Sequence, residues 1–438
     1  MIETRFVKLK MAEIDIHQYP QQYERTKRNL KHRKLSEKNI DLILLFDKYL
    51  TLDENLSIAR RIRILGLLAR IGEVFLKKDF DKVTKDDLKV VVFDIESNHL
   101  YSAWTKHLYK IVIRKFYKWL AYGDEAAREK KGQYPEIVSW INVQVKKSEL
   151  PKIEVNDLLT EDEVKMMINA ALSIRDKAFI ALLYETGSRI GEIGNMQVKD
   201  VYEDGQGMHV YFRKSKTARR ERLIILAIPY LSAWINSHPY KNDPEAPLWV
   251  KHGSKEPMMH ATFLSLLKRT ARHCGIKKRM YNHLFRHTRV THLFMQGQIN
   301  EQQAKVYFGW TPDSKVLGQY SHLISQDVDK SYKKIYGLAS EKDVKPELMP
   351  KVCGKCKAIN GFADKYCRKC GHRLDSDAGE GTSEAKAGTA RQVSPMQAAN
   401  TAGERGQVSD KVKTEALEIL KKLAENPEIK GAIDALTK

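Results

Sequence analysis

Cysteines and long apolar runs are both scarce in this sequence. The chain has 5 cysteines among 438 residues, and its uninterrupted apolar runs, such as the one at Leu42–Phe46, are far too short to span a bilayer. Residues 1–20 also lack the apolar stretch and the small-residue cleavage site of a secretory signal. We therefore expect a cytoplasmic protein in a reducing compartment, with no membrane segment and no disulfide framework.

Acidic residues are too few to balance the basic ones. The chain has 76 lysines and arginines against 55 aspartates and glutamates, so its net charge is +21 at pH 7. An excess of this size without a membrane segment favours a polyanionic partner such as nucleic acid. The length of 438 residues allows about three domains of ordinary size.

Helical periodicity dominates the first third of the chain. Apolar residues recur at helical spacing between residues 36 and 122, and Thr84 followed by two aspartates is typical of a helix start. A capping pattern of Thr160 with Glu163 opens a later region, in which strands at 209–212 and 223–228 predict a β-hairpin. The expected units are an N-terminal extension (1–35), a helical domain (36–145), a linker (146–158), a mainly helical domain with a small β-sheet (159–340), a cysteine module (350–374), a disordered linker (375–408) and a helical tail (409–438).

Three separated fragments, Thr186–Ile193, His283–His287 and Phe308–His322, carry the residues with the clearest chemical meaning. They supply two arginines, a histidine, a tryptophan and a tyrosine, namely Arg189, Arg286, His283, Trp310 and Tyr320. Two guanidiniums can hold one phosphate through forked hydrogen bonds, and a tyrosine hydroxyl can attack it. Each fragment alone is weak, since a His-x-x-Arg pair is expected about once by chance in such a chain. Together they indicate a phosphoryl transfer on nucleic acid that needs no metal or other cofactor.

In this order and spacing the fragments resemble the tyrosine recombinase, or phage integrase, family of Xer-like site-specific recombinases. That family has an arginine in a Thr-Gly-x-Arg-x-x-Glu turn, a His-x-x-Arg pair, a Gly-His or Gly-Trp, and a tyrosine about ten residues later. The resemblance covers about residues 157–336, and the helical region before it looks like the family's core-binding domain. It implies an α+β catalytic domain, mainly α with a small β-sheet, and an all-α N-terminal domain that together clamp double-stranded DNA.

The resemblance also implies a role for each matched residue. Tyr320 attacks the scissile phosphate, forms a 3′-phosphotyrosyl link and releases a 5′-hydroxyl. Arg189 and Arg286 hold the non-bridging oxygens, while His283 accepts the tyrosine proton or orients the phosphate. Trp310 stands where most members have histidine, and it donates only its indole N–H. The last supporting residue, Glu192, orients a neighbouring basic group or is only a structural ion-pair partner.

The hairpin turn would supply the general acid that protonates the departing 5′-oxygen. Lys216 is the first choice and Lys214 the alternative, because arginine does not give up its proton at neutral pH. The other basic residues of this turn, Arg219 and Arg220, are interpreted as DNA-binding residues of an exposed loop that grips phosphates, as is Lys214 if it is not the acid.

Four further cysteines form a separate pattern. Two Cys-x-x-Cys pairs, ten residues apart, bring together Cys353, Cys356, Cys367 and Cys370. This spacing predicts a zinc ribbon with a structural zinc ion, and two disulfides are the alternative. Basic residues around the ligands fit a ribbon that touches DNA, and a ribbon that docks a partner protein is the other interpretation. The remaining Cys274 is expected to be a packed thiol.

The leading hypothesis is therefore a site-specific recombinase that acts as a tetramer on two DNA sites, with accessory proteins as further partners. Its biological role would be integration or excision of a mobile element, or resolution of chromosome or plasmid multimers. Two alternatives keep the fold but change the activity. One is a catalytically silent DNA-binding regulator, and the other is an enzyme similar to type IB topoisomerases.

Overall fold

The computed structural model describes residues 14–146, 149, 154–204, 207–213, 220–295, 299–319 and 348–374. Helices dominate these ranges, and the sheets found in them are one of three strands and one of two strands. This confirms the predicted fold class. No helix in the described ranges is long and apolar enough to cross a membrane.

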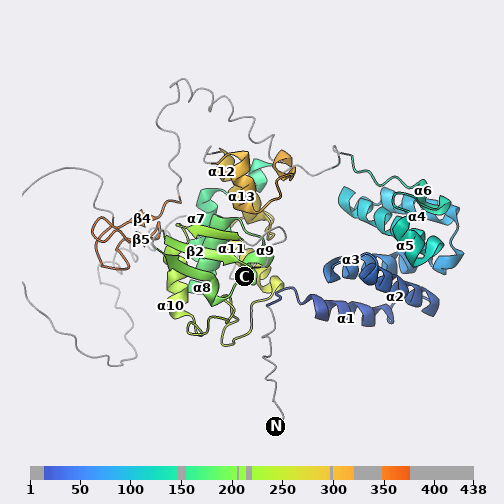
Figure 1. Ribbon diagram of the computed structural model, residues 1–438. Helices are drawn as coiled ribbons and strands as arrows, with labels where there is room; N and C mark the ends of the chain where they lie inside the picture. Colours follow the sequence, from blue (N-terminus) through green and yellow to red (C-terminus); the bar gives the residue numbers. More distant parts are fainter. Residues whose placement is uncertain are drawn as a thin grey trace, which may run out of the picture. The chain divides into compact units, whose positions relative to one another are not determined.

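The N-terminal region is entirely helical (Figure 1, blue to teal). Its core holds large aromatic side chains such as Phe46, Phe80 and Phe116, each at most 1% exposed. Thr84 caps its helix as predicted, and the bonds are reciprocal, with Asp87 also accepting from the Thr84 backbone. The elements are α1 (Tyr19–Leu30), α2 (Glu37–Leu52), α3 (Ile58–Arg70), the π-helical turn η1 (Ile71–Leu76), the 3-10 turn η2 (Phe80–Lys82), α4 (Lys85–Ser97), α5 (Ala103–Glu129) and α6 (Glu136–Ser139).

At the start of the long helix α5, the residues that are buried differ from those that the sequence predicts. The helical spacing of Trp104, Val112 and Phe116 predicts a shared core face, but Trp104 is 55% exposed, whereas Val112 and Phe116 are buried. Trp104 and Phe116 are separated by three steps of four residues, which place their side chains about 120° apart around the helix. The sequence also predicts a basic face with Lys110, but this lysine is buried and pairs with Glu96 at 2.6 Å.

Helix α1 contacts a buried ion pair of the helical domain, although residues 1–35 were predicted to form a separate extension. Arg61 of α3 donates to the carboxylate of Asp47 in α2 at 2.8 and 2.6 Å, and the hydroxyl of Tyr23 in α1 also donates to it. The arginine and aspartate side chains are only 10% and 5% exposed. Helix α1 is therefore an integral part of the helical domain.

Removing one partner of this pair should destabilise α1 to α3. Arg61→Ala leaves Asp47 buried without its cation, which costs about 3–5 kcal/mol in comparable cases. Lys89→Ala, which breaks the exposed Lys89–Asp86 pair, is the matched control and should cost less than about 1 kcal/mol. Native-state hydrogen exchange over residues 19–70 of the full chain measures both losses. Equal protection in the two variants would contradict the prediction.

The second region combines helices with a small sheet. Thr160 begins α7 with the predicted capping box, in which Glu163 bonds the Thr160 backbone. The elements are η4 (Val155–Asp157), α7 (Glu161–Ala170), α8 (Ile174–Thr186), α9 (Ile190–Gly194), η5 (Val198–Asp200), β1 (Val201–Asp204), β2 (Gly207–Phe212), β3 (Arg220–Ile224), α10 (Ile228–Ser237), α11 (His260–His273), α12 (Leu284–Met295), α13 (Glu301–Phe308) and η6 (Val316–Gln319).

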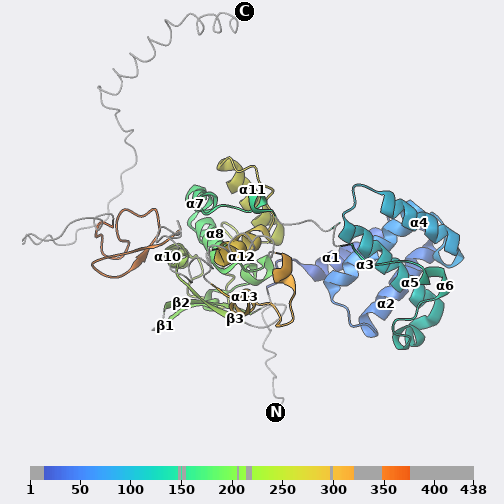
Figure 2. The same ribbon diagram turned by 90° about the horizontal axis from the view of Figure 1, so that it is seen from above.

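The sheet of this region is antiparallel, in the order β1-β2-β3. The predicted hairpin is present as β2 and β3, with Phe212 opposite Arg220, but its second strand covers 220–224 instead of the predicted 223–228. Strand β1 was not predicted. Figure 2 shows the strands at one border of the region, with α8, α10 and α12 on one side of them. Helix α8 is buried along most of its length and forms the centre of the core.

Ile16, which precedes α1, belongs to the core of the second region. Ile16 is 1% exposed, and its side chain packs against Gly194. A Cβ atom on Gly194 would lie only 2.6 Å from it. Its backbone N–H donates to the side chain of Asn195 at 3.1 Å, and its carbonyl accepts from the backbone of His260 at 3.0 Å. The chain therefore contributes to this core at Ile16, before it enters the helical domain.

Candidate active site

A left-handed turn at Gly187 ends α8 and begins the first motif. Gly187 has φ +52°, and its N–H bonds the carbonyls of Leu183 and Tyr184. A Cβ at this position would lie 2.6 Å from the ring of Phe308, so both the backbone and the space require glycine. The turn thereby packs directly against the end of α13.

Arg189 follows this turn and is held by Glu192. The backbone N–H of Arg189 donates to Glu192 Oε2 at 2.9 Å, and its Nη1 donates to Oε1 at 2.8 Å. Burial opposes ionisation of Glu192, but Arg220 and Arg189 together lower the pKa of its carboxyl below the ordinary value. Glu192 thus remains charged and pairs with Arg189, which both interpretations of this residue predicted.

Arg286 joins the first motif to the third. Its Nη1 donates to the carbonyl of Gly187 at 3.0 Å and its Nη2 to the carbonyl of Phe308 at 2.6 Å. The guanidinium is 5.2 Å from the centre of the Trp310 ring, within cation–π distance. Because Arg286 is only 4% exposed, its guanidinium is fixed by the fold.

The histidines of the second motif occupy different environments. His283 is exposed and lies directly before α12, one turn ahead of Arg286. His287 lies one turn further on, and burial, with His283 and Arg286 nearby, lowers its pKa to about 4. His287 is therefore neutral at physiological pH and does not add charge to the site.

The third motif is the turn at the end of α13. Gly309 has φ +62° and ends the helix, and the N–H of Trp310 donates to the carbonyl of Lys305 at 2.8 Å. The Trp310 ring packs on Phe308 at 5.2 Å, and Phe308 in turn packs against Gly187. The structure therefore brings Arg286 against Trp310 and against the turn at Gly187 that leads to Arg189, and His283, one turn before Arg286, is exposed. Tyr320, Lys216, Lys214 and Arg219 lie outside the described residues.

Arg220 does not lie in the exposed DNA-binding loop that was expected. It is the first residue of β3, its side chain is 6% exposed, and it pairs with Glu192 at 2.5 Å. The prediction of a phosphate contact is wrong for this residue, because the guanidinium is directed into the protein. The signal for the burial of Arg220 is the period-2 alternation of strands, since Arg220 and Arg222 share a face with the buried Ile224.

Sequence comparison agrees with this geometry. The profile of the phage integrase family matches residues 157–327, which include all three motifs. We call this matched segment the integrase domain, after the family model that it resembles.

Curated relatives of the chain are recombinases and transposases. A tyrosine recombinase of Thermosipho africanus is 30% identical over 188 residues, which cover 42% of this chain and 62% of the relative. Transposase A of transposon Tn554 from Staphylococcus aureus is 27% identical over 47% of this chain and 57% of that protein. Tyrosine recombinase XerA of Saccharolobus solfataricus is 26% identical over 61% of this chain and 84% of that protein. The chain thus spans less than two thirds of the length of the first two relatives.

Among solved structures, the fold is shared with the XerH site-specific recombinase bound to palindromic difH substrate in a post-cleavage complex. The TM-score is 0.50 at 16% sequence identity, and the match covers 75% of this chain and 99% of that one. This likeness supports the same fold class for the integrase domain and for the helical domain before it.

The sequence missed one residue that stabilises the integrase domain, Glu185. Its buried carboxylate accepts backbone N–H groups of Ile225, Leu226 and Ala227 at 2.6, 3.0 and 2.8 Å. Burial raises the pKa of this carboxyl. The carboxylate ties the end of β3 to α8, directly before the first motif. No sequence pattern marks it, because a glutamate in a helix is usually solvated.

A separate candidate centre follows the integrase domain. The Sγ atoms of the four cysteines lie within 4.8 Å of one another, and all four are free thiols. Zinc bound to four thiolates at about 2.3 Å would set the sulfur atoms about 3.8 Å apart, so this donor set fits a zinc ion. The two Cys-x-x-Cys turns have the same form, with a left-handed residue, Lys357 or Gly371, directly after the second cysteine.

The cysteine module contacts the integrase domain rather than standing alone. Its two strands, β4 (Lys351–Val352) and β5 (Ile359–Asn360), are antiparallel. Arg368 donates to the carbonyl of Pro229 at 2.9 Å, and the rings of Phe362 and Tyr230 are 6.1 Å apart. Part of the module is therefore buried against α10.

Proposed function

We propose that this protein is a site-specific DNA recombinase that cuts and rejoins strands through a 3′-phosphotyrosine intermediate. The observation that carries the proposal is the position of Arg286. It donates to the carbonyls of Gly187 and Phe308 and so brings the first and third motifs together around its own guanidinium. A cluster of two arginines, a histidine and a tryptophan suits the stabilisation of charge on a phosphate.

The arginines bind and polarise the scissile phosphate. Arg189 makes one described side-chain hydrogen bond, to Glu192, which leaves other N–H groups of its fork for phosphate oxygens. Arg286 presents its guanidinium beside Trp310, whose indole N–H makes no hydrogen bond to a described residue and serves as a further donor. These donors are fixed before the substrate arrives, which is the condition for strong electrostatic stabilisation of a transition state.

Tyr320 carries out the covalent step. Its phenolic oxygen forms a bond to phosphorus, and the bond between phosphorus and the 5′-oxygen breaks. A tyrosine has a pKa near 10, so its proton must leave during attack, and His283 is the acceptor in this proposal. Lys216 protonates the departing 5′-oxygen, with Lys214 as the alternative. Attack by the 5′-hydroxyl of a second strand reverses these bond changes and releases Tyr320.

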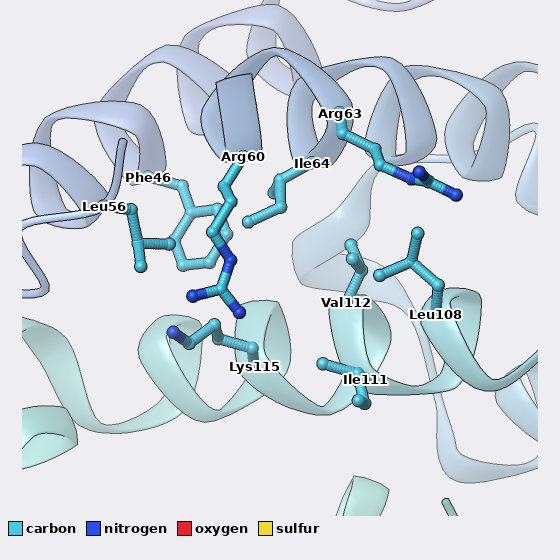
Figure 3. A pocket seen from close by; sticks show the side chains of 9 residues that line it. All are labelled: Phe46, Leu56, Arg60, Arg63, Ile64, Leu108, Ile111, Val112 and Lys115. Atoms are coloured by element: carbon cyan, nitrogen blue, oxygen red, sulfur yellow. The ribbon is translucent and has the colours of Figure 1, made fainter. Parts of the chain in front are cut away.

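The helical domain supplies a basic surface for the DNA backbone. A cavity of about 320 Å³ between α3 and α5 has an apolar floor that includes Phe46 and Ile64. Figure 3 shows Arg60 of α3 extending toward Lys115 of α5, with Arg63 further along the same helix. Arg60 and Arg63 are exposed and form no ion pair within the described ranges. This surface would contact phosphates in the clamp, in agreement with the net charge of +21.

Recombination of this type joins two DNA sites, so the working assembly is proposed to be a tetramer. The reaction would serve integration or excision of a mobile element, or resolution of chromosome or plasmid multimers, and accessory proteins would contribute to site choice. The ester with Tyr320 conserves the energy of the broken backbone bond, so the reaction needs no cofactor.

A suicide substrate tests the proposal. Double-stranded DNA from the region flanking the gene, nicked near the cleavage point, should trap an SDS-resistant adduct with a phosphotyrosyl peptide and a free 5′-hydroxyl. Binding without an adduct at every site tested would favour the silent regulator instead. Relaxation of plasmids that lack any specific site would indicate the topoisomerase activity.

The cysteine module is proposed to hold one structural zinc ion through Cys353, Cys356, Cys367 and Cys370. Cys356→Ser should lower the zinc content to well below one ion per chain, because three thiolates bind zinc more weakly than four. Cys274→Ser is the matched control, since that thiol is far from the cluster in sequence and should not change the content. Elemental analysis of the purified chain measures both. Equal zinc loss in the two variants would contradict the assignment.

A further inference from the structure

Arg220 contacts the turns of the first and third motifs through its guanidinium. Its Nη2 donates to Glu192 Oε2 at 2.5 Å and to the hydroxyl of Ser188 at 3.2 Å. Its Nη1 donates to the carbonyl of Tyr307 at 2.6 Å. The guanidinium also stacks over the ring of Phe212, 4.8 Å from its centre. One side chain therefore contacts the first motif, the end of α13 and the hairpin.

The link to Glu192 reaches the phosphate-binding arginine. Glu192 Oε1 accepts from the Arg189 side chain, while Oε2 accepts from the Arg189 backbone and from Arg220. Arg220 and Arg189 both pair with this carboxylate. Without Arg220, the buried Glu192 would depend more on Arg189 and draw that guanidinium away from the phosphate.

The second link reaches the turn that carries Trp310. A Cβ on Gly309 would lie 3.1 Å from Cδ of Arg220 and 3.2 Å from its Nε, so the arginine fills the space that this glycine leaves. Gly309 directly precedes Trp310, and Arg220 directly follows the hairpin connection that contains Lys216. The packing thus joins the segment with the proposed acid to the segment that leads to Tyr320.

We propose that Arg220 is a positioning residue for strand cleavage, which acts by holding Glu192 in place for Arg189 and by fixing the Gly309–Trp310 turn against the hairpin. This inference rests on the proposed recombinase function. It assigns to Arg220 an effect on the rate of cleavage and not on the affinity for DNA, since its guanidinium is buried.

The neighbouring Arg222 offers a matched control. Its Nε donates to the carbonyl of Tyr307 at 2.8 Å and its Nη2 donates to the carbonyl of Val306, so it also stabilises the end of α13. Its charge also acts on Glu192, whereas Arg220 both pairs with that carboxylate and donates a hydrogen bond to it. A loss that comes only from loosening α13 should therefore appear in both arginine variants, whereas a loss through Arg189 should appear only in Arg220→Ala.

A double-mutant cycle on the suicide substrate separates these effects. At saturating protein, Arg220→Ala should lower the single-turnover cleavage rate about 10-fold to 100-fold, with the DNA affinity within about twofold of wild type. In an Arg189→Ala background the same substitution should cost less than in wild type, because the link through Glu192 no longer acts and only the packing on the Gly309–Trp310 turn remains. Arg222→Ala should slow cleavage by the same factor in both backgrounds. Arg220→Lys should recover part of the rate, since it keeps the charge beside Glu192.

Three results decide the matter. If Arg220→Ala cleaves at the wild-type rate, or if its effect multiplies fully with that of Arg189→Ala, the positioning of Arg189 through Glu192 is wrong while the recombinase function stands. If wild type itself forms no adduct at any site, the function fails and this role fails with it. Should Arg220→Ala not fold, Glu192→Gln replaces it in the cycle, because it removes the same charge link with little change of shape.

Discussion

Tyr320→Phe is expected to abolish the covalent protein–DNA adduct while DNA affinity stays within about twofold of wild type. The phenyl ring keeps the shape of the side chain but has no oxygen that can bond to phosphorus. Removing the nucleophile of a covalent mechanism lowers rates by about 10⁴-fold or more, so adduct should fall below detection. Denaturing gels with labelled suicide substrate measure the adduct, and filter binding measures the affinity.

Two other tyrosines serve as controls for this prediction. Tyr307 has its hydroxyl occupied, because it donates to the carbonyl of Glu185 at 2.7 Å, and its ring lies beside that of Phe308. Tyr332, which lies outside the described residues, is the other alternative nucleophile in the region. Tyr332→Phe should leave the adduct yield unchanged. An adduct that persists in Tyr320→Phe and maps to either residue by mass spectrometry would refute the assignment.

Local signals in the sequence predicted the parts of this fold that depend on near neighbours. The helix start at Thr84 and the capping box at Thr160 formed as expected, because each needs only a partner three residues away. The turn at Gly187 likewise follows from its own backbone preference. The three motifs were also found, since the resemblance to a family supplied their joint meaning even though they are far apart in the chain.

Contacts that depend on strand register were not predictable in the same way. Arg220 becomes buried only because β3 pairs with β2 so that Phe212 lies opposite it, and a shift of one residue would have turned it to solvent. Strand alternation puts Arg220 on the buried face of β3. In the sequence this alternation is hard to recognise, because Leu223 and Ile225 are apolar although they are 45% and 49% exposed. The contribution of Ile16 to the second core was missed for a related reason, as it depends on Gly194, far away in sequence.

Arg189→Ala should lower the rate of strand cleavage about 10²-fold to 10³-fold, the usual cost of one transition-state donor. The substitution also removes a cation from Glu192, but Arg220 remains at 2.5 Å, so the buried carboxylate keeps a partner and the fold should survive. Arg189→Lys should fall between wild type and Arg189→Ala, because lysine keeps the charge but lacks the planar fork that binds two phosphate oxygens.

The control for this prediction is an arginine of the same region with no part in the proposed site. Arg175 donates to Asp176 at 2.9 Å and to the carbonyl of Val250 at 2.7 Å, and Arg175→Ala should change cleavage less than about threefold. Single-turnover cleavage at saturating protein, with DNA affinity measured in parallel, assigns each loss to the chemical step or to binding. If Arg189→Ala weakened only affinity and left the cleavage rate intact, Arg189 would be a DNA-binding residue and the charge-stabilising cluster would reduce to Arg286 and its neighbours.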